Sequence, residues 1–222
     1  MPQLRLSCGI FLLSRKSGKL HVCVVKKRHT YSIMDILGGT YSSETVAHVV
    51  NTMSTREQSL LSSFDTMWVD VWGALDIATD MYQRGKAKYT ELRPDTVPIL
   101  NSTEPIYEIP KGRPNLREPI LTCAMREHSE ETGIIPADYE IVQPFPQLRY
   151  YFTDMGKLYK YIYFIAYSGE CRATEVSNCE IDHVRWLSLT ELNKLYTQGQ
   201  FPVYKWVRSI FRKCSTIAIN TI

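Results

Sequence analysis

Stretches rich in apolar and β-branched residues predict β-strands near the start of the chain and again in its second half. Residues 4–13 and 20–28 are two such stretches, and the turn-forming segment RKSGK separates them. Residues 138–153 and 157–168 have the same character and meet at the short sequence DMGK. We therefore expect two β-hairpins.

The end of the chain combines one more predicted strand with two predicted helices. Residues 180–196 predict a strand that continues into a helix, and residues 201–213 predict a final amphipathic helix. The apolar side of this last helix is expected to consist of Val203, Trp206, Val207, Ile210 and Phe211. Together with the hairpins, these elements predict a fold of the α/β class.

The segment from residue 43 to residue 92 contains almost no glycine or proline. It places apolar residues at helical spacing, beginning with Val46, Val49, Val50 and Met53. We expect two or three helices here, and the two prolines of RPDTVP to end them.

A chain of 222 residues is long enough for one large domain or for one domain with a sizeable insertion. The helical segment therefore predicts an inserted subdomain over residues 43–95. This subdomain would divide the α/β domain into residues 1–42 and residues 96–222.

A further helix is predicted from Glu118 to Thr132, where Gly133 ends it. A helical residue turns by about 100°, so that three glutamates fall on one face of this helix. These residues are Glu127, Glu130 and Glu131. Leu121, Met125 and His128 fall on a neighbouring face, which we expect to pack against the core.

Three carboxylates on one helix face repel one another, and this repulsion has two interpretations. The simpler one is a solvated acidic face that Arg126 partly neutralises. The other is a site for a hard divalent cation, because Mg²⁺ and similar ions prefer carboxylate oxygens. No cysteine or histidine cluster lies nearby, so zinc is not expected.

The spacing of the surrounding residues favours the metal site. Residues 112–134 match the pattern G-x5-E-x7-R-E-U-x-E-E-x-G-U, where U is an apolar residue. The matching residues are Gly112, Glu118, Arg126, Glu127, Glu130, Glu131, Gly133 and Ile134. This stretch resembles the Nudix box, the loop–helix–loop signature of the Nudix hydrolases. His128 departs from the box at its inner apolar position, and we expect it to be a hydrogen-bonded core histidine.

The resemblance implies a Nudix α/β/α sandwich with a mixed sheet, and it assigns roles to the matching residues. Glu127, Glu130 and Glu131 would bind Mg²⁺ or Mn²⁺, and one of them would act as the base that activates water. The carboxylates would be held by Arg126 and oriented by Glu118. The missing side chain of Gly112 would let the backbone approach the metal.

Two further segments resemble mRNA-decapping members of the family. The sequence PKG places Lys111 before the first glycine of the box, as in decapping enzymes and diphosphoinositol polyphosphate hydrolases, and we expect it to contact substrate phosphates. The segment EIDHVRW resembles the one whose glutamate completes the metal site or acts as general base, which makes Glu180 the candidate here. We expect Trp186 of this segment to belong to the core.

The placement of the helical insertion resembles the decapping Nudix proteins of large cytoplasmic DNA viruses. The resemblance implies a hydrolase that cleaves the triphosphate bridge of the mRNA cap and releases methylated GDP and 5′-monophosphate RNA. Hydrolysis of diphosphoinositol polyphosphates or dinucleoside polyphosphates is the enzymatic alternative. A Nudix module that binds RNA without turnover is the alternative from another class.

Capped RNA would need contacts to its phosphates and to its methylated base. Basic residues at the end of the insertion alternate with Tyr82 and Tyr89, an arrangement that suits a single strand. These basic residues are Arg84, Lys86, Lys88 and Arg93, and the C-terminal helix offers a second basic face with Lys205, Arg208, Arg212 and Lys213. The candidates for stacking on the cap are Tyr31, Tyr150, Tyr151 and Phe152.

Composition adds little to this picture. The formal net charge of +3 permits a polyanionic partner without demanding one. Six dispersed cysteines without a C-x-x-C pair favour a reducing compartment, and the short apolar run at the N-terminus is too short to span a membrane. We expect a protein of the cytoplasm, that of the host if the protein is viral, with no membrane insertion. The sequence does not determine its oligomeric state.

Overall fold

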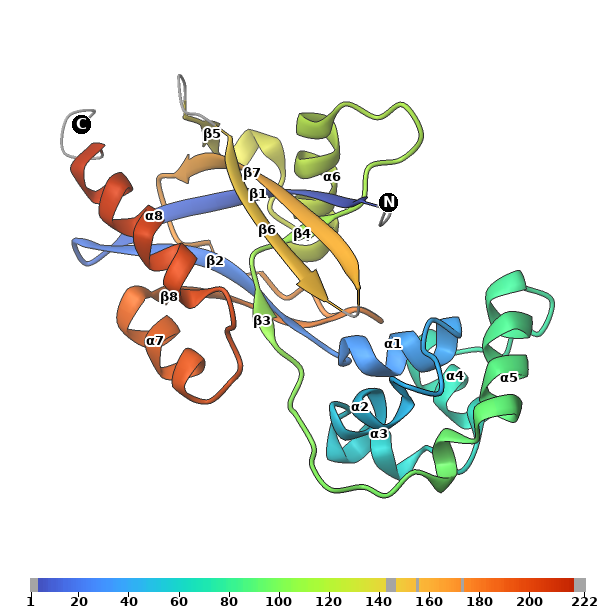
Figure 1. Cartoon of the computed structure of the whole chain (residues 1–222). Helices are drawn as coiled ribbons and strands as arrows, with labels where there is room; N and C mark the ends of the chain where they lie inside the picture. Colours follow the sequence, from blue (N-terminus) through green and yellow to red (C-terminus); the bar gives the residue numbers. More distant parts are fainter. Residues whose placement is uncertain (1–3, 143–146, 155, 173, 218–222) are drawn as a thin grey trace. The chain divides into compact units, whose positions relative to one another are not determined.

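The computed structural model describes residues 4–142, 147–154, 156–172 and 174–217 (Figure 1). The chain forms two compact units. The first, here called the sheet unit, comprises Met1–Lys26, Tyr107–Ser177 and Ile181–Ile222. The second, the helical unit, comprises Lys27–Ile106 and Asn178–Glu180. It therefore extends beyond both ends of the range 43–95.

The sheet unit is built on a mixed sheet in which long strands β1 and β7 run parallel at the centre. The order is β3-β2-β1-β7-β5, with β4 paired to β1, β6 to β7 and β8 to β2. The strands are β1 (Leu4–Lys16), β2 (Lys19–Lys27), β3 (Tyr107–Glu108), β4 (Lys111–Gly112), β5 (Glu140–Ile141), β6 (Leu148–Asp154), β7 (Lys157–Ser168) and β8 (Ile181–Ser188).

Both predicted hairpins are present. Strands β1 and β2 are antiparallel with Lys16 opposite Lys19, and Ser17 and Gly18 between them both have positive φ (50° and 74°). Such a two-residue turn matches the twist of the strands that it joins. In the second hairpin, Asp154 lies opposite Lys157. The predicted first strand of this hairpin, 138–153, divides into β5 and β6, and its residues 143–146 lie outside the described range.

Alternate residues of β1 contribute to two separate hydrophobic cores. Cys8, Ile10 and Leu12 belong to a core that includes Cys123 and Ala124 of helix α6 (Ile120–Thr132). Phe11 and Leu13 belong to the other core, together with residues of α7 (Leu189–Thr197) and α8 (Tyr204–Ile217). Successive strand residues point to opposite faces of a sheet, so one strand supports helices on both sides. The predicted α/β/α sandwich with a mixed sheet is confirmed.

The helices of the sheet unit follow the predictions with small shifts. Helix α6 begins at Ile120 rather than Glu118, because Pro119 has an extended conformation (ψ 142°) and precedes the first turn, and Gly133 ends the helix with φ 71°. The buried face of α6 contains Cys123, Ala124 and His128, while Leu121 and Met125 are only partly buried. The apolar side predicted for the last helix is confirmed: Val207, Ile210 and Phe211 are buried, and Val203 and Trp206 pack against the same core.

The helical unit contains more and shorter helices than the sequence predicts. They are α1 (Tyr31–Gly38), α2 (Val46–Asn51), α3 (Thr55–Ser59), α4 (Phe64–Trp72) and α5 (Asp80–Leu92), followed by a 3-10 turn at Pro94–Thr96. Ser54, Ser63 and Thr79 each accept a hydrogen bond from a backbone N–H and thereby start a new helix. Apolar spacing alone predicts two or three longer helices here, and these caps divide them into shorter ones. Helix α1 was not predicted.

Buried hydrogen bonds and close helix packing both stabilise the helical unit. The buried carboxylate of Glu57 accepts hydrogen bonds from the Thr30 N–H (2.8 Å), the Thr30 hydroxyl (2.7 Å) and the Ser54 N–H (2.8 Å). Helices α1 and α5 touch at Gly85, where a Cβ atom would lie 2.0 Å from the Leu37 carbonyl oxygen. The close approach of these helices therefore requires glycine at this position.

Within the described residues, no helix is long and apolar enough to cross a membrane. All six cysteines are free thiols.

Candidate active site

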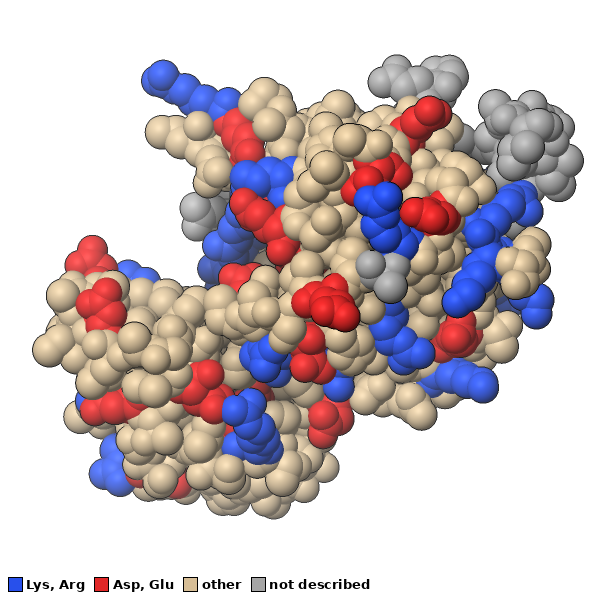
Figure 2. All heavy atoms as spheres, turned by 180° about the vertical axis from the view of Figure 1, so that it is seen from behind, with Lys and Arg blue, Asp and Glu red and all other residues tan. Residues whose placement is uncertain are grey.

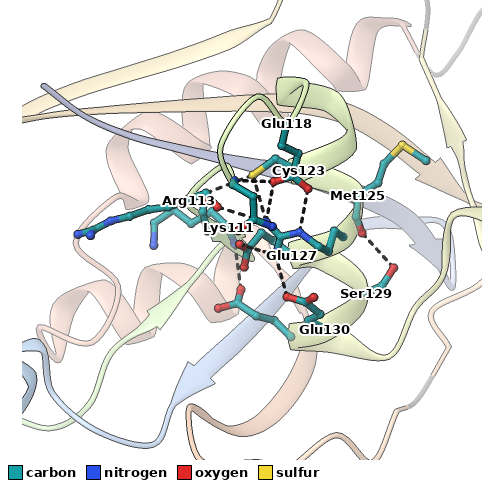
Figure 3. Close-up of polar contacts among 12 residues, drawn as sticks. Lys111, Arg113, Glu118, Cys123, Met125, Glu127, Ser129 and Glu130 are labelled. Carbon is teal, nitrogen blue, oxygen red and sulfur yellow. Dashed lines mark hydrogen bonds and ion pairs between the residues drawn. The ribbon is translucent and has the colours of Figure 1, made fainter. Parts of the chain in front are cut away.

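The side chain of Arg126 is the centre of a charged cluster on α6 that includes Glu118, Glu127 and Glu130, the three glutamates labelled in Figure 3. Its Nε and Nη2 atoms donate to the two oxygens of Glu118, both at 2.9 Å. Its Nη1 atom donates to Glu127 at 2.8 Å and to Glu130 at 3.0 Å. One guanidinium therefore holds three carboxylates that would otherwise repel one another.

Glu118 reaches this network because it lies in the loop before the helix. There its carboxylate also accepts a hydrogen bond from the Asn115 N–H (2.8 Å), which orients it toward Arg126. The hydrogen bonds from Arg126, followed by the one from Asn115, lower the pKa of Glu118 to about 2. The same pairing with Glu118 raises the pKa of the Arg126 guanidinium. Both groups are therefore charged at neutral pH.

Gly112 lies directly against Glu127. A Cβ atom on Gly112 would lie 1.9 Å from the carboxyl carbon of Glu127, so that any other residue would displace this carboxylate. The requirement for glycine at this place in the pattern thus has a steric cause in the structure.

The third glutamate of the helix face points away from Arg126. Glu131 is buried, and its carboxylate accepts a hydrogen bond from the backbone N–H of Lys111 at 2.9 Å. The ammonium of Lys111 is bound to Glu108 at 2.6 Å and lies 4.8 Å from the centre of the Tyr161 ring. Burial by itself lowers the pKa of Lys111, but the surrounding carboxylates and tyrosines, with Glu108 the strongest of them, together outweigh burial and raise the pKa. Lys111 is therefore a buried cation at the edge of the cluster.

The residues present fit a hard divalent cation. Glu127, Glu130 and Glu131 supply only oxygen donors, and the half-buried Arg126 neutralises one charge while contacting three carboxylates. Among the described residues, no three acidic, histidine or cysteine side chains already converge on a common point. The contacts give the reason: Nη1 of Arg126 donates to both Glu127 and Glu130, while Glu131 accepts a hydrogen bond from the Lys111 N–H. Glu130, whose side chain is 58% exposed, has the freedom to turn toward an ion.

The model of the NUDIX domain family matches residues 95–207, which is more than half of the chain and includes the whole cluster. The chain belongs to the Nudix family. It is accordingly a Nudix hydrolase, an enzyme that cleaves diphosphate bonds.

Relatives of this Nudix protein occur in large DNA viruses. The mRNA-decapping protein g5R of African swine fever virus (isolate Pig/Kenya/KEN-50/1950) is 29% identical over 218 residues, which cover 89% of this chain and 86% of the relative. The g5R protein of the strain Badajoz 1971 is 30% identical, with 89% and 84% covered. The resemblance to viral Nudix proteins that the sequence predicts is thereby confirmed.

Solved structures support the fold alone. An Ap4A hydrolase of C. elegans in a binary complex is 12% identical and covers 97% of this chain and 98% of its own, with a TM-score of 0.52. The Nudix hydrolase RenU of M. smegmatis is also 12% identical and has a TM-score of 0.50, with 94% and 86% covered.

Two residues predicted for the Nudix site lie in the helical unit. Glu180 belongs to the segment Asn178–Glu180 of that unit, where its exposed carboxylate is 3.9 Å from the Lys27 ammonium. Tyr31 is the first residue of α1, and it is 50% exposed. Their roles in metal and cap binding stay predictions.

The remaining cap candidates lie on β6 and divide between the two faces of the sheet. Tyr150 and Phe152 share one face with Tyr161, because their ring centres lie 6.3 and 5.1 Å from that of Tyr161. Tyr151 points to the opposite face, where it is 52% exposed and lies 5.7 Å from the Lys160 ammonium. Tyr150 and Phe152 therefore share a surface with the Lys111 ammonium, and Tyr151 does not.

The basic residues at the end of the insertion have acidic partners. Lys86 binds Asp65 (2.7 Å), Lys88 binds Glu91 (3.2 Å), and Arg93 binds Asp95 through two hydrogen bonds (3.0 and 2.9 Å). Arg84 donates to the backbone carbonyl of Gly38 at 3.4 Å.

The tyrosines between these basic residues are core residues rather than stacking platforms. Both are buried, and their hydroxyl groups donate to Asp65 and to the Leu61 carbonyl. The expectation that Tyr82 and Tyr89 face an RNA strand is therefore wrong, because the same helical spacing that interleaves them with cations also turns them inward.

His128 is a core residue, as predicted, but the hydrogen bond expected for its ring is absent among the described residues. It is fully buried, its ring meets that of Tyr139 edge to face at 5.6 Å, and burial lowers its pKa to about 3. Within the described part of the chain, neither ring nitrogen has a hydrogen-bond partner. The imidazole is therefore neutral and acts as an apolar side chain. Trp186 packs against the same core, as expected, and donates to the Arg172 carbonyl.

Glu108 and Tyr161 were not predicted as site residues, although they contact the Lys111 ammonium. The alternation of tyrosines in YKYIYF (159–164) is a signal that one face of β7 is aromatic, and it places Tyr161 in the centre of that face. No comparable signal singles out Glu108.

Proposed function

We propose that this Nudix hydrolase is an mRNA-decapping enzyme that uses Mg²⁺ or Mn²⁺. It would hydrolyse the triphosphate bridge of the cap and release methylated GDP and RNA with a 5′-monophosphate. The observation that carries this proposal is the similarity to g5R, which covers 89% of the chain and so extends well beyond the residues 95–207 that define the family. The helical unit is thus part of the similarity to a protein described as mRNA-decapping.

The charged cluster supplies the parts that such a reaction needs. Glu127, Glu130 and Glu131 would hold the ion, and one of them would accept a proton from the attacking water. When bound, the ion would neutralise phosphate charge and make water easier to deprotonate. Arg126, already fixed by both oxygens of Glu118, would keep Glu127 and Glu130 in place.

Other predicted contacts extend this proposal to the substrate. Lys111 would contact the phosphates, which requires its ammonium to be shared between the substrate and Glu108. Glu180 would complete the metal site or act as the general base. The methylated base, which carries a positive charge, would stack on an aromatic ring of β6. Tyr150 and Phe152 lie on one face of β6 and Tyr151 lies on the other, so they are separate candidates for stacking on the cap.

The decisive experiment follows the products of RNA labelled in its cap. With Mn²⁺ or Mg²⁺ the protein should release methylated GDP, and chelation of the metal should stop the release. Glu130→Gln and Glu131→Gln should each abolish turnover, since each removes one negative donor from the ion. Glu44→Gln, a change of the same kind at a residue of the helical unit, is the matched control. Full activity of both box variants would refute the mechanism.

The enzymatic alternatives are tested in the same format. A diphosphoinositol polyphosphate and a dinucleoside polyphosphate are incubated separately with protein and Mn²⁺, and their turnover is compared with that of capped RNA. Faster turnover of either compound than of capped RNA would replace decapping as the proposed activity. Failure to hydrolyse any of the three would favour a module that only binds RNA.

A further inference from the structure

The basic charge of this protein is concentrated at its C-terminal end. Residues 192–222 contain five lysines and arginines and no aspartate or glutamate, so they carry +5 of a net charge of only +3. The first 191 residues therefore carry −2. On the face drawn in Figure 2, acidic and basic side chains are interspersed. A local excess of positive charge therefore indicates a binding surface for a polyanion better than the net charge of the whole chain does.

Helix α8 presents most of this excess on one side. Its apolar residues Val207, Ile210 and Phe211 face the core, whereas Lys205, Arg208, Arg212 and Lys213 are exposed. At about 100° per residue, these four cations fall within an arc of roughly 140°. We call this set of four residues the α8 stripe. Over its 14 residues the helix is about 20 Å long, so the stripe can follow an extended polyanion.

The stripe differs from the basic residues of α5 in how its charges are balanced. Lys86, Lys88 and Arg93 each have an acidic partner within 3.2 Å. In the described part of the chain, Lys205, Arg208 and Lys213 form no ion pair, and α8 itself contains no acidic residue. A phosphate that binds Lys86, Lys88 or Arg93 must displace a carboxylate, whereas a phosphate that binds Lys205, Arg208 or Lys213 displaces only water and counterions.

An aromatic path leads from the start of the stripe to the box. Trp206, next to Lys205, lies 5.4 Å from Tyr150, and Tyr150 lies 6.3 Å from Tyr161, measured between ring centres. Tyr161 lies 4.8 Å from the Lys111 ammonium, and the Lys111 N–H is bound to the carboxylate of Glu131. Aromatic rings next to a row of cations form the arrangement that holds single-stranded nucleic acid through base stacking and phosphate contacts.

We propose that the α8 stripe binds the phosphate backbone of single-stranded RNA next to the cap, and that the path from Trp206 to Tyr161 guides the strand to the box. The stripe is thus the main RNA-binding surface, in preference to the basic residues of α5. The direction of the strand rests on the proposed decapping function, but the binding itself does not.

The test uses the full-length protein and uncapped single-stranded RNA without added metal, so that no turnover is needed. In the triple variant Lys205→Gln/Arg208→Gln/Lys213→Gln, affinity at 0.1 M salt should fall on the order of 10- to 100-fold, because three phosphate contacts are lost. The slope of log affinity against log salt should become shallower by about two. The variant Lys205→Arg/Lys213→Arg, which keeps the charge, should bind as the unmodified protein does.

The matched control removes the same charge elsewhere on the sheet unit. Lys16→Gln/Lys19→Gln/Lys194→Gln changes three exposed lysines of the β1–β2 turn and of α7, and it should weaken binding much less than the stripe variant. Equal losses in the two variants would show a general charge effect and overturn the proposal. If the slope of log affinity against log salt became shallower in Arg84→Gln/Lys88→Gln but not in the stripe variant, the proposal would be overturned. The RNA-binding surface would then be α5.

A kinetic measurement separates this inference from the proposed function. In the stripe variant, KM should rise more for long capped RNA than for a cap dinucleotide, because only the former reaches the stripe. Unchanged KM for long capped RNA would contradict the inference while leaving decapping intact. If the protein fails to cleave caps at all, the binding experiment with uncapped RNA still decides whether the stripe is used.

Discussion

Helices α6 and α5 both have 13 residues and both carry dense charge, but their charges are balanced in different ways. Around α6, one guanidinium serves Glu118, Glu127 and Glu130, so that negative charge remains in excess. Around α5, each lysine and the terminal Arg93 has a carboxylate of its own. The charge left over after pairing, rather than charge density, therefore distinguishes a binding site from an ordinary solvated helix.

The largest expected effect comes from removing the shared cation of α6. In Arg126→Ala, Glu127 and Glu130 lose their common partner and repel each other, so we expect turnover and metal affinity to fall on the order of 10- to 100-fold. Titration of activity with Mn²⁺ measures both. Arg56→Ala, which removes an exposed arginine paired with a single aspartate in the helical unit, is the control. Similar activity in the two variants would mean that the shared arginine has no special role.

The second prediction concerns the contact that shapes the helical unit. In Gly85→Ala, the new Cβ would collide with the Leu37 carbonyl oxygen, and we expect the free energy of unfolding to fall by about 1–3 kcal/mol. Denaturant unfolding measures this change. Gly169→Ala is the control, since no atom lies within 4 Å of a Cβ at that position. Equal stability of the two variants would show that α1 and α5 do not depend on their close approach.

The third prediction follows from the buried histidine of α6. Because burial lowers the pKa of His128 from an ordinary value of about 6.5 to about 3, the unfolded chain binds a proton below pH 6.5 and the folded chain does not. This contribution to stability is complete above pH 6.5 and is lost as pH falls toward 3, by up to about 1.4 kcal/mol per pH unit. In His128→Leu, unfolding followed between pH 7 and pH 4 should show a weaker dependence on pH. The same slope in both proteins would contradict a neutral core histidine.

The smallest effect is expected for the one-to-one pairs of α5. Exposed ion pairs contribute about 0–1 kcal/mol, so Lys88→Ala should change the free energy of unfolding by less than about 1 kcal/mol. Turnover of a cap dinucleotide should stay close to that of the unmodified protein. A loss of activity as large as that of Arg126→Ala would show that pairing does not distinguish the two helices.

Much of the fold was predictable because its signals are local. Both hairpins, the strand and helix after Glu180, the final helix and the end of α6 at Gly133 follow from turn residues, apolar spacing and caps. The number of helices between residues 43 and 92 was underestimated, because three side-chain caps break a continuous apolar pattern. Helix α1 was not predicted because it has only eight residues and one side-chain cap, at Thr30. A helix of this length is too short to show a clear helical spacing of apolar residues.

The sequence by itself determined the charged face of α6. Residues three and four positions apart on a helix lie near one another, so the spacing already places Glu130 beside both Glu127 and Arg126. The tertiary structure decided everything that depends on partners distant along the chain. It paired Lys86 with Asp65, turned Tyr82 and Tyr89 inward, and surrounded Lys111 with Glu108 and Tyr161.

The same distinction explains the basic segments. In the sequence, the cations of α5 and of α8 look equally available, because a list of residues does not show which charges meet across a fold. The structure gives Lys86, Lys88 and Arg93 acidic neighbours. It leaves Lys205, Arg208 and Lys213 without ion pairs in the part of the chain that it describes. Spacing along one helix is set by backbone geometry, whereas the balance of charge is set by how separate elements pack.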